Sequence, residues 1–419
     1  MPGVPIDCVI FGGGVAGVWI LDAIARSGRS VLLLESDELG AGQTVCAQGI
    51  IHGGFKYTLR GLLTPSAAAI AEMPQRWRRS LDGAAEPSLV GVRVRAASCV
   101  LWQTRSLSSA IGMIGARAGL RVTPTALAAE SRPAPLRDAP GTVARLDEQV
   151  IDPASMLDVL SSRWRTRIVR IDARHGLEIR TEESTAGRAR AAASGPRSGP
   201  VRCVSLLQPE TGDVLDLAPE LVVLAAGVGN ERLREACGLD AAVAQRRPLH
   251  MTMARGTLPE LNGHCVDGAR TRVTITSSVD SERRVVWQIG GQIAEDGVEL
   301  DEPGLISRAV EELSAVLPGT SLDGVAWSTY RVDRAERRVA GRSGHLVAPM
   351  RPDDVQLLRD GNVATVWPTK LALAPRLADM TLASAPPASH AFDLERVAGW
   401  PRPLVALPPW EWPRRWRSA

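Results

Sequence analysis

The chain has 419 residues, of which 45% are hydrophobic and 23% are charged. This composition excludes an intrinsically disordered chain, a collagen-like chain and a small disulfide-stabilised scaffold, and the length suggests two or three domain-sized units. The formal net charge of +3 is too small to require a nucleic-acid or membrane partner.

The cysteines and the apolar runs further restrict the class of protein and its expected location. The six cysteines include no Cys-x-x-Cys pair, so we expect no metal cluster, and a reducing cytoplasmic location fits them. The first residues lack the basic region, apolar run and cleavage site of a signal peptide. No uncharged apolar run reaches about 18 residues, so we expect no transmembrane segment.

The first predicted elements are a strand, a glycine-rich turn, a helix and a second strand. Residues 5–11 form a short apolar run rich in β-branched residues, which is typical of a buried parallel strand. Gly-Gly-Gly-Val-Ala-Gly follows at 12–17, and the apolar periodicity of 18–25 predicts a helix. Residues 31–34 predict a second buried strand, which Glu35 closes.

This order of elements indicates a dinucleotide-binding site. Gly12 permits the tight turn, Gly14 lets the backbone approach a pyrophosphate, and Gly17 lets the helix lie close to the strand. The helix N-terminus offers unpaired N–H groups and a positive dipole to the phosphates. Glu35, 18 residues after Gly17, is placed to accept hydrogen bonds from ribose hydroxyls, which disfavours NADP. The alternative is a glycine-rich turn without a ligand.

Residues 51–57 read Ile-His-Gly-Gly-Phe-Lys-Tyr and combine four residue types that are rare in this chain, which has 6 His, 3 Phe, 2 Tyr and only two lysines, Lys56 and Lys370. A chance cluster is the alternative explanation. The segment at 40–57 resembles the flavin-contacting stretch of FAD-dependent oxidoreductases of the D-amino-acid oxidase and glycine oxidase type. Its His-Gly-Gly core is also similar to FAD-dependent glycerol-3-phosphate and 2-hydroxyglutarate dehydrogenases. The resemblance implies that this segment runs from the pyrophosphate to the isoalloxazine ring.

Helix and strand patterns alternate through the middle of the chain. Periodicity predicts helices over 64–82, 106–118 and 153–163. Strands are predicted within 89–102, near 167–172 and 176–180, and as a hairpin of 201–207 and 213–217. Residues 182–200 are polar and non-periodic, and we interpret them as a surface loop.

A strongly apolar strand at 221–224 runs into the small residues Ala225-Ala226-Gly227. This arrangement resembles the family's second FAD-contacting segment, in which the backbone touches the cofactor. Ala226 and Gly227 are therefore assigned to the cofactor site, and a plain strand-to-helix turn is the alternative.

Residues 243–332 are β-rich, with a helix predicted over 303–316. The resemblance implies that this sheet covers one face of the flavin and carries an arginine for a substrate carboxylate. Arg331 stands where that arginine would be, with Tyr330 beside it, and a guanidinium can bind a carboxylate through two parallel hydrogen bonds. The family's usual Arg-Pro-x-x-Pro-Asp-Gly continuation is absent. The alternative is a solvated or ion-paired strand residue.

Residues 361–375 predict a strand, a turn and the beginning of a helix. In the family, backbone N–H groups of this third segment face the flavin pyrimidine ring. Here the turn is Pro-Thr-Lys, where the family usually has a glycine-rich sequence. Thr369, Lys370 and Leu371 are assigned to the cofactor, and Lys370 would place a positive charge beside flavin N1 and the C2 carbonyl.

The C-terminal residues 385–419 are rich in proline, tryptophan and arginine. We interpret them as a strap packed on the domain surface. An arm that contacts a membrane surface or a nucleic acid is the alternative.

Together these patterns predict an α/β protein. It would have a Rossmann-like, doubly wound FAD-binding domain and a smaller α+β substrate domain with a mostly antiparallel sheet. The FAD-binding domain is expected to comprise 1–85, 146–235 and 335–384, and the substrate domain 86–145 and 236–334. The cofactor-binding residues that the motif and the resemblance imply are Gly12, Gly14, Val15, Ala16, Gly17, Glu35, Ser36, Gln43, Thr44, Gln48, Gly49, Ile50, Ala226, Gly227, Thr369, Lys370 and Leu371.

The reaction that the resemblance implies is oxidation of a C–H bond next to an amine, in an amino acid or a secondary amine, by hydride transfer to flavin N5. Oxygen or a quinone would be the electron acceptor. Oxidation of a 2-hydroxy acid or a polyol phosphate stays open, as do an amino-acid-like group carried on a nucleic acid and a purely structural use of the flavin. The candidate catalytic residues are His52, Lys56, Tyr57, Tyr330 and Arg331, and no metal site is expected.

Overall fold

The computed structural model describes residues 3–54, 70–104, 124–182, 199–267, 270–339, 352 and 354–418. The chain forms two compact units, which we describe separately. Unit 1 consists of Met1–Val45, Leu157–Arg247 and Arg334–Ala406. Unit 2 consists of Cys46–Met156, Pro248–Asp333 and Leu407–Ala419.

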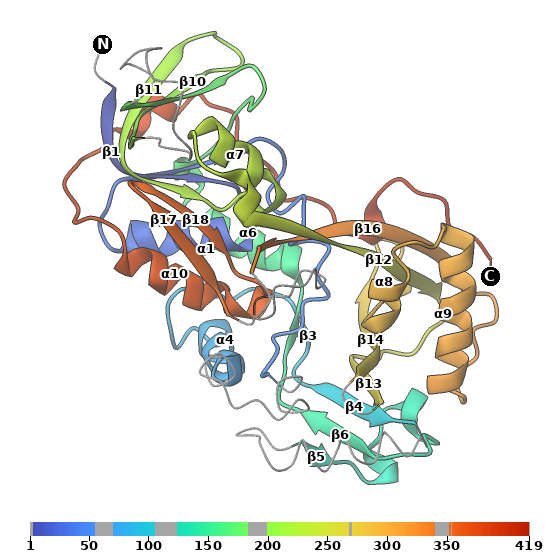
Figure 1. Cartoon of the computed structure of the whole chain (residues 1–419). Helices are drawn as coiled ribbons and strands as arrows, with labels where there is room; N and C mark the ends of the chain where they lie inside the picture. The colour runs from blue at the N-terminus through green and yellow to red at the C-terminus, as the bar shows by residue number, and fades with distance from the viewer. Residues whose placement is uncertain are drawn as a thin grey trace. The chain divides into compact units, whose positions relative to one another are not determined.

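A sheet of eight strands lies at the centre of the described part of unit 1 (Figure 1). Its main path runs β17-β18-β11-β1-β2-β8, and β10 and β9 continue from β11. The pairs within β18-β11-β1-β2-β8 are parallel, whereas β17, β10 and β9 pair antiparallel. The strands are β1 (Val4–Phe11), β2 (Val31–Glu35), β8 (Ile168–Arg170), β9 (Leu177–Thr181), β10 (Val201–Leu207), β11 (Val214–Leu224), β17 (Gln356–Asp360) and β18 (Val363–Trp367).

The parallel strands of this sheet are largely apolar because helices cover them. In β1, every residue from Ile6 to Phe11 is buried. Helices α1 and α10 lie side by side in unit 1 (Figure 1). The helices assigned to this unit are α1 (Val15–Arg26), α7 (Asn230–Ala236), α10 (Ala374–Ala383) and most of α6 (Pro153–Ser162). The predicted Rossmann-like sheet is therefore confirmed.

Strand β11 is longer than predicted. We expected a hairpin strand and a separate strand at 221–224, but Val214–Leu224 is continuous. Its first part pairs with β10 as far as Leu217, and its last part pairs with β18 from Val222 onward. Pro219 lies between these two stretches, where neither partner needs its missing N–H group. The change of partner lets one strand serve both the hairpin and the parallel sheet.

The main sheet of unit 2 also has eight strands among the described residues, in the order β16-β12-β15-β14-β13-β4-β6-β5. Its pairs from β12 to β5 are antiparallel except β13 with β4, so the expectation of a mostly antiparallel sheet is confirmed. The strands are β4 (Cys99–Gln103), β5 (Thr125–Ala126), β6 (Val143–Leu146), β12 (Ala244–Gly256), β13 (Gly263–Asp267), β14 (Arg270–Val279), β15 (Val285–Gly290) and β16 (Ala326–Arg337). A two-stranded sheet pairs β3 (Val94–Ala96) with β7 (Val150–Ile151).

The two faces of this sheet differ in character. Ile275, Trp287 and Ile289 point to one face, where they form an apolar core with buried residues of α9 (Glu302–Val316). Asp301 begins α9 by accepting the N–H of Gly304 at 2.9 Å. The neighbouring residues of β14 and β15 point to the other face, because side chains alternate along a strand. The shorter helices of unit 2 are α4 (Met73–Leu81) and α8 (Gln292–Asp296).

The compact units divide the chain at different points from the expected domains. Residues 46–54 belong to unit 2, because Ile50 forms a bridge with Val150 and the N–H of Ile151 bonds to the carbonyl of Gly49. The predicted helix at 106–118 and most of the predicted loop at 182–200 lie outside the described residues.

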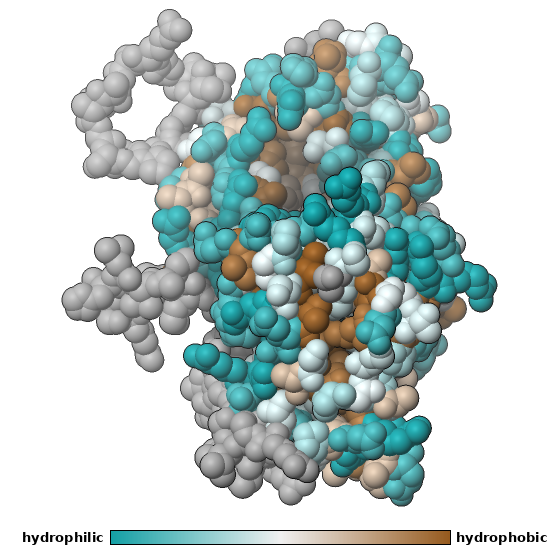
Figure 2. Space-filling view, turned by 90° about the vertical axis from the view of Figure 1, so that its right-hand side faces the viewer, coloured by the Kyte–Doolittle hydropathy of each residue, from teal (hydrophilic) through white to brown (hydrophobic). Residues whose placement is uncertain are grey.

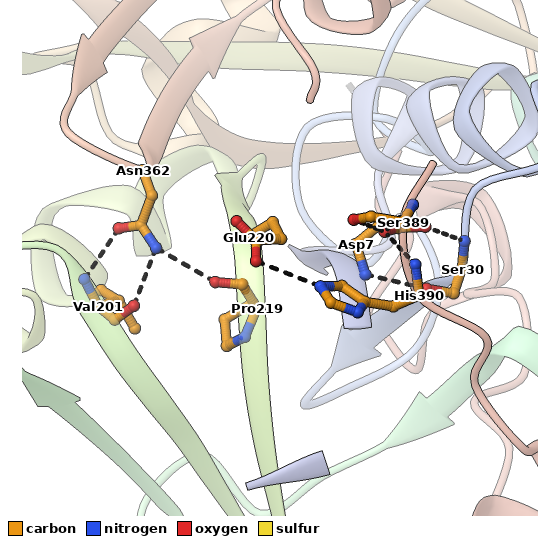
Figure 3. A network of polar contacts seen from close by, with 8 residues as sticks. All are labelled: Asp7, Ser30, Val201, Pro219, Glu220, Asn362, Ser389 and His390. Carbon is orange, nitrogen blue, oxygen red and sulfur yellow. Dashed lines mark hydrogen bonds and ion pairs between the residues drawn. The ribbon is translucent and has the colours of Figure 1, made fainter. Parts of the chain in front are cut away.

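The C-terminal segment is divided between the units. In unit 1, the buried carboxylate of Asp7 accepts the N–H groups of Ser389 and His390, both at 3.0 Å, and the N–H of Ser30 at 2.8 Å (Figure 3). In unit 2, Arg417 pairs with Trp327 through their backbones. Within each unit this segment is packed as a strap, which matches the first of the two interpretations of the tail.

The outer surface mixes polar and apolar residues. On the face drawn in Figure 2, hydrophilic residues cover much of the surface and hydrophobic residues gather in patches between them. The large exposed apolar side chains include Val90, Val214 and Leu404, which are distant in the sequence. None of the helices in the described ranges has the length and apolar character that crossing a membrane requires.

Candidate active site

The turn between β1 and α1 requires glycine at two positions. Gly12 has φ +104°, and a Cβ there would lie 2.5 Å from the Cα of Ala226. A Cβ on Gly17 would overlap the carbonyl oxygen of Gly12. The chain therefore turns sharply at the end of β1, and α1 starts close against the strand.

The first turn of α1 suits an anion. Gly14 is the N-cap residue and provides no side-chain capping bond, and this turn contains no acidic residue. Thr44 Oγ1 accepts the N–H of Val15 at 3.0 Å, which fixes the 40–45 loop to the beginning of the helix. Together with the helix dipole, the first-turn N–H groups of residues such as Ala16 form the kind of site that binds a diphosphate.

The carboxylate of Glu35 lies beside this turn. Its Oε2 accepts the N–H of Gly13 at 2.5 Å, and its Oε1 accepts the N–H groups of Ser36 at 2.7 Å and Asp37 at 3.0 Å. Glu35 is thus oriented at the carboxyl end of β2, where a carboxylate of this fold binds ribose hydroxyls. Ser36 lies next to it along the chain.

The second predicted cofactor segment packs over the same turn. Gly227 has φ +58°, and the N–H of Ala226 donates to Asn230 Oδ1 at 2.8 Å. Asn230 is fully buried, and its Nδ2 donates to the carbonyl of Val366 in β18 at 3.3 Å. Sequence reasoning missed Asn230. Its position as the first residue of a helix after a small-residue turn was the available signal.

Hydrogen bonds fix two further predicted cofactor-binding residues, Gln43 and Thr369, within unit 1. Gln43 Oε1 accepts the N–H of Ala335 at 3.2 Å. Thr369 has φ +59°, an unusual conformation for a residue with a branched side chain. Its Oγ1 and the N–H of Lys370 both donate to the carbonyl of Pro368, at 2.7 and 2.6 Å. Threonine thus takes the backbone conformation for which the family usually has glycine, and Lys370 and the partly exposed Leu371 follow it.

The turn after β1, the N-terminus of α1 and the carboxylate of Glu35 are compatible with bound FAD. A side chain at Gly12 or Gly17 would fill the turn that a pyrophosphate must approach, and both positions are glycine. The N-cap residue of the helix that follows, Gly14, has no side chain to cap it, and Glu35 supplies a carboxylate at the next strand. The donor and acceptor set is the one that the adenosine diphosphate part of FAD needs.

The segment at 48–50 is held on the unit 2 sheet. Gln48 Nε2 donates to the carbonyls of Thr274 and Gln288, both at 3.0 Å. Gly49 has φ +79°, and a Cβ there would overlap the carbonyl oxygen of Ile151. With Ile50 bridged to β7, this predicted cofactor segment has a defined path on the polar face of the sheet.

Tyr330 lies on the same polar face. Its hydroxyl donates to the carbonyl of Cys46 and accepts from Gln288 Nε2, both at 3.0 Å. Burial raises the pKa of Tyr330 well above its usual range. Thr276 is directly opposite Gln288 in the β14-β15 pair and therefore shares its face. Gln288 Oε1 and Thr276 Oγ1 are buried and have no hydrogen-bond partner among the described residues.

Arg331 points away from Tyr330, because neighbouring residues of a strand lie on opposite faces. It is exposed, and its Nη1 and Nη2 donate to the carbonyls of Val298 at 2.7 Å and Leu300 at 2.9 Å. In this arrangement the guanidinium fixes the segment before α9, which is a different set of partners from the carboxylate that the resemblance implied.

His52 meets two residues that the sequence analysis did not select. Its Nδ1 lies 3.4 Å from Glu148 Oε2, and Nε2 of His264 lies 3.6 Å from the same oxygen. Burial raises the pKa of Glu148, but the two imidazoles lower it by more, so that the net pKa is below the usual range. Sequence spacing gave no signal for this group, because about a hundred residues separate each member from the next. Lys56 and Tyr57 lie outside the described residues.

A family model described as FAD dependent oxidoreductase matches residues 7–358. The chain belongs to this family. It is therefore an FAD-dependent oxidoreductase with FAD as its cofactor, as the glycine-rich turn and the resemblance predicted.

Relatives of known sequence and structure agree with this membership. The probable FAD-dependent oxidoreductase PA4991 of Pseudomonas aeruginosa is 37% identical over 415 residues, which cover 97% of each chain. Its crystal structure matches with a TM-score of 0.76 at 33% identity, over 98% of this chain and 99% of that chain.

Two more distant structures share the fold. Glycine oxidase from Geobacillus kaustophilus has a TM-score of 0.60 at 15% identity, over 94% of this chain and 98% of that chain. Dithionite-reduced L-alpha-glycerophosphate oxidase from Mycoplasma pneumoniae, with FAD bound, has a TM-score of 0.57 at 12% identity, over 93% and 97%.

Proposed function

We propose that this FAD-dependent oxidoreductase oxidises a C–H bond next to an amine nitrogen in a small molecule, such as an amino acid or a secondary amine. When bound, FAD supplies the hydride acceptor at flavin N5. The observation that carries the amine preference is the buried amide oxygen Gln288 Oε1 on the polar face of the unit 2 sheet, which has no partner among the described residues. The hydroxyl of Thr276 beside it, which can donate or accept, has none there either.

The orientation of the Gln288 amide supports this preference. The hydroxyl of Tyr330 gives its proton to the carbonyl of Cys46, so its oxygen must accept from Gln288 Nε2. The amide oxygen of Gln288 is then left as an acceptor. An amine or ammonium group can donate to it, whereas an unprotonated phosphate or carboxylate cannot. Leaving such a buried oxygen unpaired costs about 1–3 kcal/mol.

Oxidation of a C–H bond next to a hydroxyl is the second candidate. A hydroxyl can also donate to Gln288, and the likeness of Ile51-His52-Gly53-Gly54 to hydroxyl-oxidising dehydrogenases favours it. The fold shared with a glycerophosphate oxidase is compatible with it. A ketone product without release of ammonia or amine would distinguish this candidate from the first.

Anaerobic mixing of the purified yellow protein with separate panels of amines and hydroxy acids tests the proposal. We expect the oxidised flavin band near ~450 nm to bleach with at least one amine. Bleaching only by hydroxy acids or polyol phosphates would establish the second candidate. No bleaching by any compound would favour a structural use of the flavin.

A small-molecule substrate fits the C-terminal segment better than a nucleic-acid-borne one. Trp410 is buried, and Arg414 Nη1 donates to the carbonyl of Thr329 at 2.6 Å. These side chains are used inside unit 2 and are not presented as an arm. A gel shift with RNA or DNA should accordingly be absent at physiological salt.

The electron acceptor and the cellular location are also proposals. We infer oxygen or a quinone as acceptor, and comparing the reoxidation of the reduced protein by air and by a soluble quinone tests this. All six cysteines are free thiols, which fits a reducing cytoplasm. Cell fractionation tests the location.

A further inference from the structure

Glu148 Oε2 lies between two histidine nitrogens in unit 2. His52 Nδ1 is 3.4 Å away and His264 Nε2 is 3.6 Å away, and all three atoms lie within 4.8 Å of one another. These distances exceed the 2.7–3.2 Å of a good N–H···O hydrogen bond. Ligand atoms at about 2.0–2.1 Å from one tetrahedral metal ion are separated by about 3.3 Å. The two separations from Glu148 Oε2 are close to that value.

The outer atoms of two of these side chains are already oriented by hydrogen bonds. His264 Nδ1 lies 2.9 Å from Thr274 Oγ1, and Glu148 Oε1 accepts the N–H of Gly53 at 2.7 Å. Partners of this kind fix the ring and the carboxylate of metal ligands so that the inner atoms converge. The inner atoms of Glu148 and His264 thus face one common point.

Burial leaves one oxygen of this group without a hydrogen bond. The side chains of Glu148 and His264 are 3% and 4% exposed, and Glu148 Oε2 has no hydrogen-bond partner among the described residues. The two imidazoles offset the hydration that this oxygen has lost, but neither makes a good hydrogen bond to it. One divalent ion would bond to this oxygen and to both imidazole nitrogens.

We propose that His52, Glu148 and His264 form a site for one divalent transition-metal ion, with zinc as the preferred ion. Two imidazoles and one carboxylate are a ligand set that zinc takes in catalytic sites, with the fourth position left for water or substrate. The side chain of His52 is 31% exposed, so this is where the fourth ligand would enter. Ferrous iron accepts the same three ligands and is the competing ion.

Metal content of the FAD-loaded protein tests the proposal. After treatment with a chelator and dialysis, the protein is equilibrated with zinc chloride or, anaerobically, with ferrous sulfate. We expect one equivalent of zinc per chain, and an affinity that falls by about 100-fold or more in His264→Asn and Glu148→Gln. His175→Asn is the matched control, because His175 pairs with Asp172 on an exposed loop of unit 1, and it should retain the full equivalent.

Three results would overturn the proposal. The first is the absence of a stoichiometric ion, either zinc or ferrous iron, in the wild-type protein. The second is equal zinc binding by wild type, Glu148→Gln and His264→Asn. If these variants fail to fold, X-ray absorption of the zinc-loaded wild type decides instead. Two imidazoles with oxygen ligands at about 2.0–2.1 Å are expected, and sulfur ligands at about 2.3 Å would be the third contrary result. Stoichiometric binding of iron but not of zinc would uphold the site and correct the metal.

Discussion

Thr44 Oγ1 accepts the N–H of Val15, the first residue of α1, at 3.0 Å. One hydroxyl therefore joins the 40–45 loop to the N-terminus of the helix that we expect to bind the pyrophosphate of FAD. Replacing Thr44 with valine removes this bond and keeps the shape of the side chain. We expect Thr44→Val to weaken FAD binding about tenfold, which corresponds to about 1.4 kcal/mol.

Fluorescence of released FAD during dilution measures this effect. Thr125→Val is a suitable control, because Thr125 is exposed in β5 of unit 2. Unchanged FAD affinity in Thr44→Val would mean that the loop is held in place by other contacts.

Gly17→Ala should abolish FAD binding or folding, because its Cβ would overlap the carbonyl oxygen of Gly12. Gly42→Ala is the matched control, since a Cβ on the exposed Gly42 meets no atom within 4 Å. The flavin-to-protein absorbance ratio and the circular dichroism of both variants check the prediction. A yellow, fully folded Gly17→Ala protein would contradict the packing of α1 on β1.

Gln288→Met tests the acceptor that carries the proposed function. Methionine has a similar volume but no amide oxygen, so we expect KM for an amine substrate to rise about tenfold or more. Gln292→Met is the control, because Gln292 is bonded to Asp296 on the surface helix α8. Steady-state kinetics with the best amine of the panel give the comparison. An unchanged KM would remove Gln288 from the substrate site.

Arg331→Met distinguishes the role that the resemblance implied from the one that the geometry supports. Loss of the bonds to Val298 and Leu300 should lower the free energy of unfolding by about 1–2 kcal/mol, with little change in KM. Thermal denaturation and kinetics with a carboxylate-bearing substrate provide the two measurements. A large rise in KM without loss of stability would instead support carboxylate binding by Arg331.

Asp7→Asn tests the attachment of the C-terminal strap in unit 1. Burial raises the pKa of Asp7, but hydrogen bonds from Ser389 and Ser30 outweigh this effect and leave the pKa below its usual value. An amide would turn a donor toward these donors. We therefore expect Asp7→Asn to lower the free energy of unfolding by about 2 kcal/mol or more at neutral pH.

The sign of the pH dependence follows from the lowered pKa. The stabilisation by the Asp7 carboxylate is fully present above about pH 4, the unfolded value, and is lost as the pH falls through the lowered folded-state pKa. Urea denaturation measures the free energy of unfolding. The difference in this free energy between wild type and Asp7→Asn should therefore be smaller at acidic pH than at neutral pH. A constant difference would mean that the carboxylate is not the group responsible.

The sequence predicted the cofactor-binding part of the fold because its signals are local. The glycines of the first turn are spaced along one strand-turn-helix unit, and Glu35 closes the next strand. The Rossmann-like sheet, the mostly antiparallel second sheet and FAD as cofactor are confirmed. The sequence did not predict the hydrogen bonds of Asn230 and Thr369. The bond of Asn230 depends on contact with another strand, and that of Thr369 depends on an unusual backbone conformation.

The group around His52 shows where sequence reasoning stops. Glu148 precedes the short strand β7 and His264 lies within β13, so neither belongs to a motif with His52. The pairing of β13 with β4 and the bridge between Ile50 and Val150 help to bring these elements together in unit 2. Arg331 illustrates the opposite situation, in which the sequence suggested a role that the structure does not support directly. Its place in the sequence suggested that it binds a substrate carboxylate, whereas its side chain lies on the other face from Tyr330 and bonds to backbone carbonyls.

The division of the C-terminal strap bears on how the two units fold. Ser389, which bonds to Asp7 in unit 1, and Arg417, which pairs with Trp327 in unit 2, both follow every strand of the two sheets in the sequence. Each unit therefore needs a segment from beyond its own sheet to reach its final structure. Removing residues 386–418 would leave both units incomplete, so that a single truncation would expose the whole described chain to proteolysis.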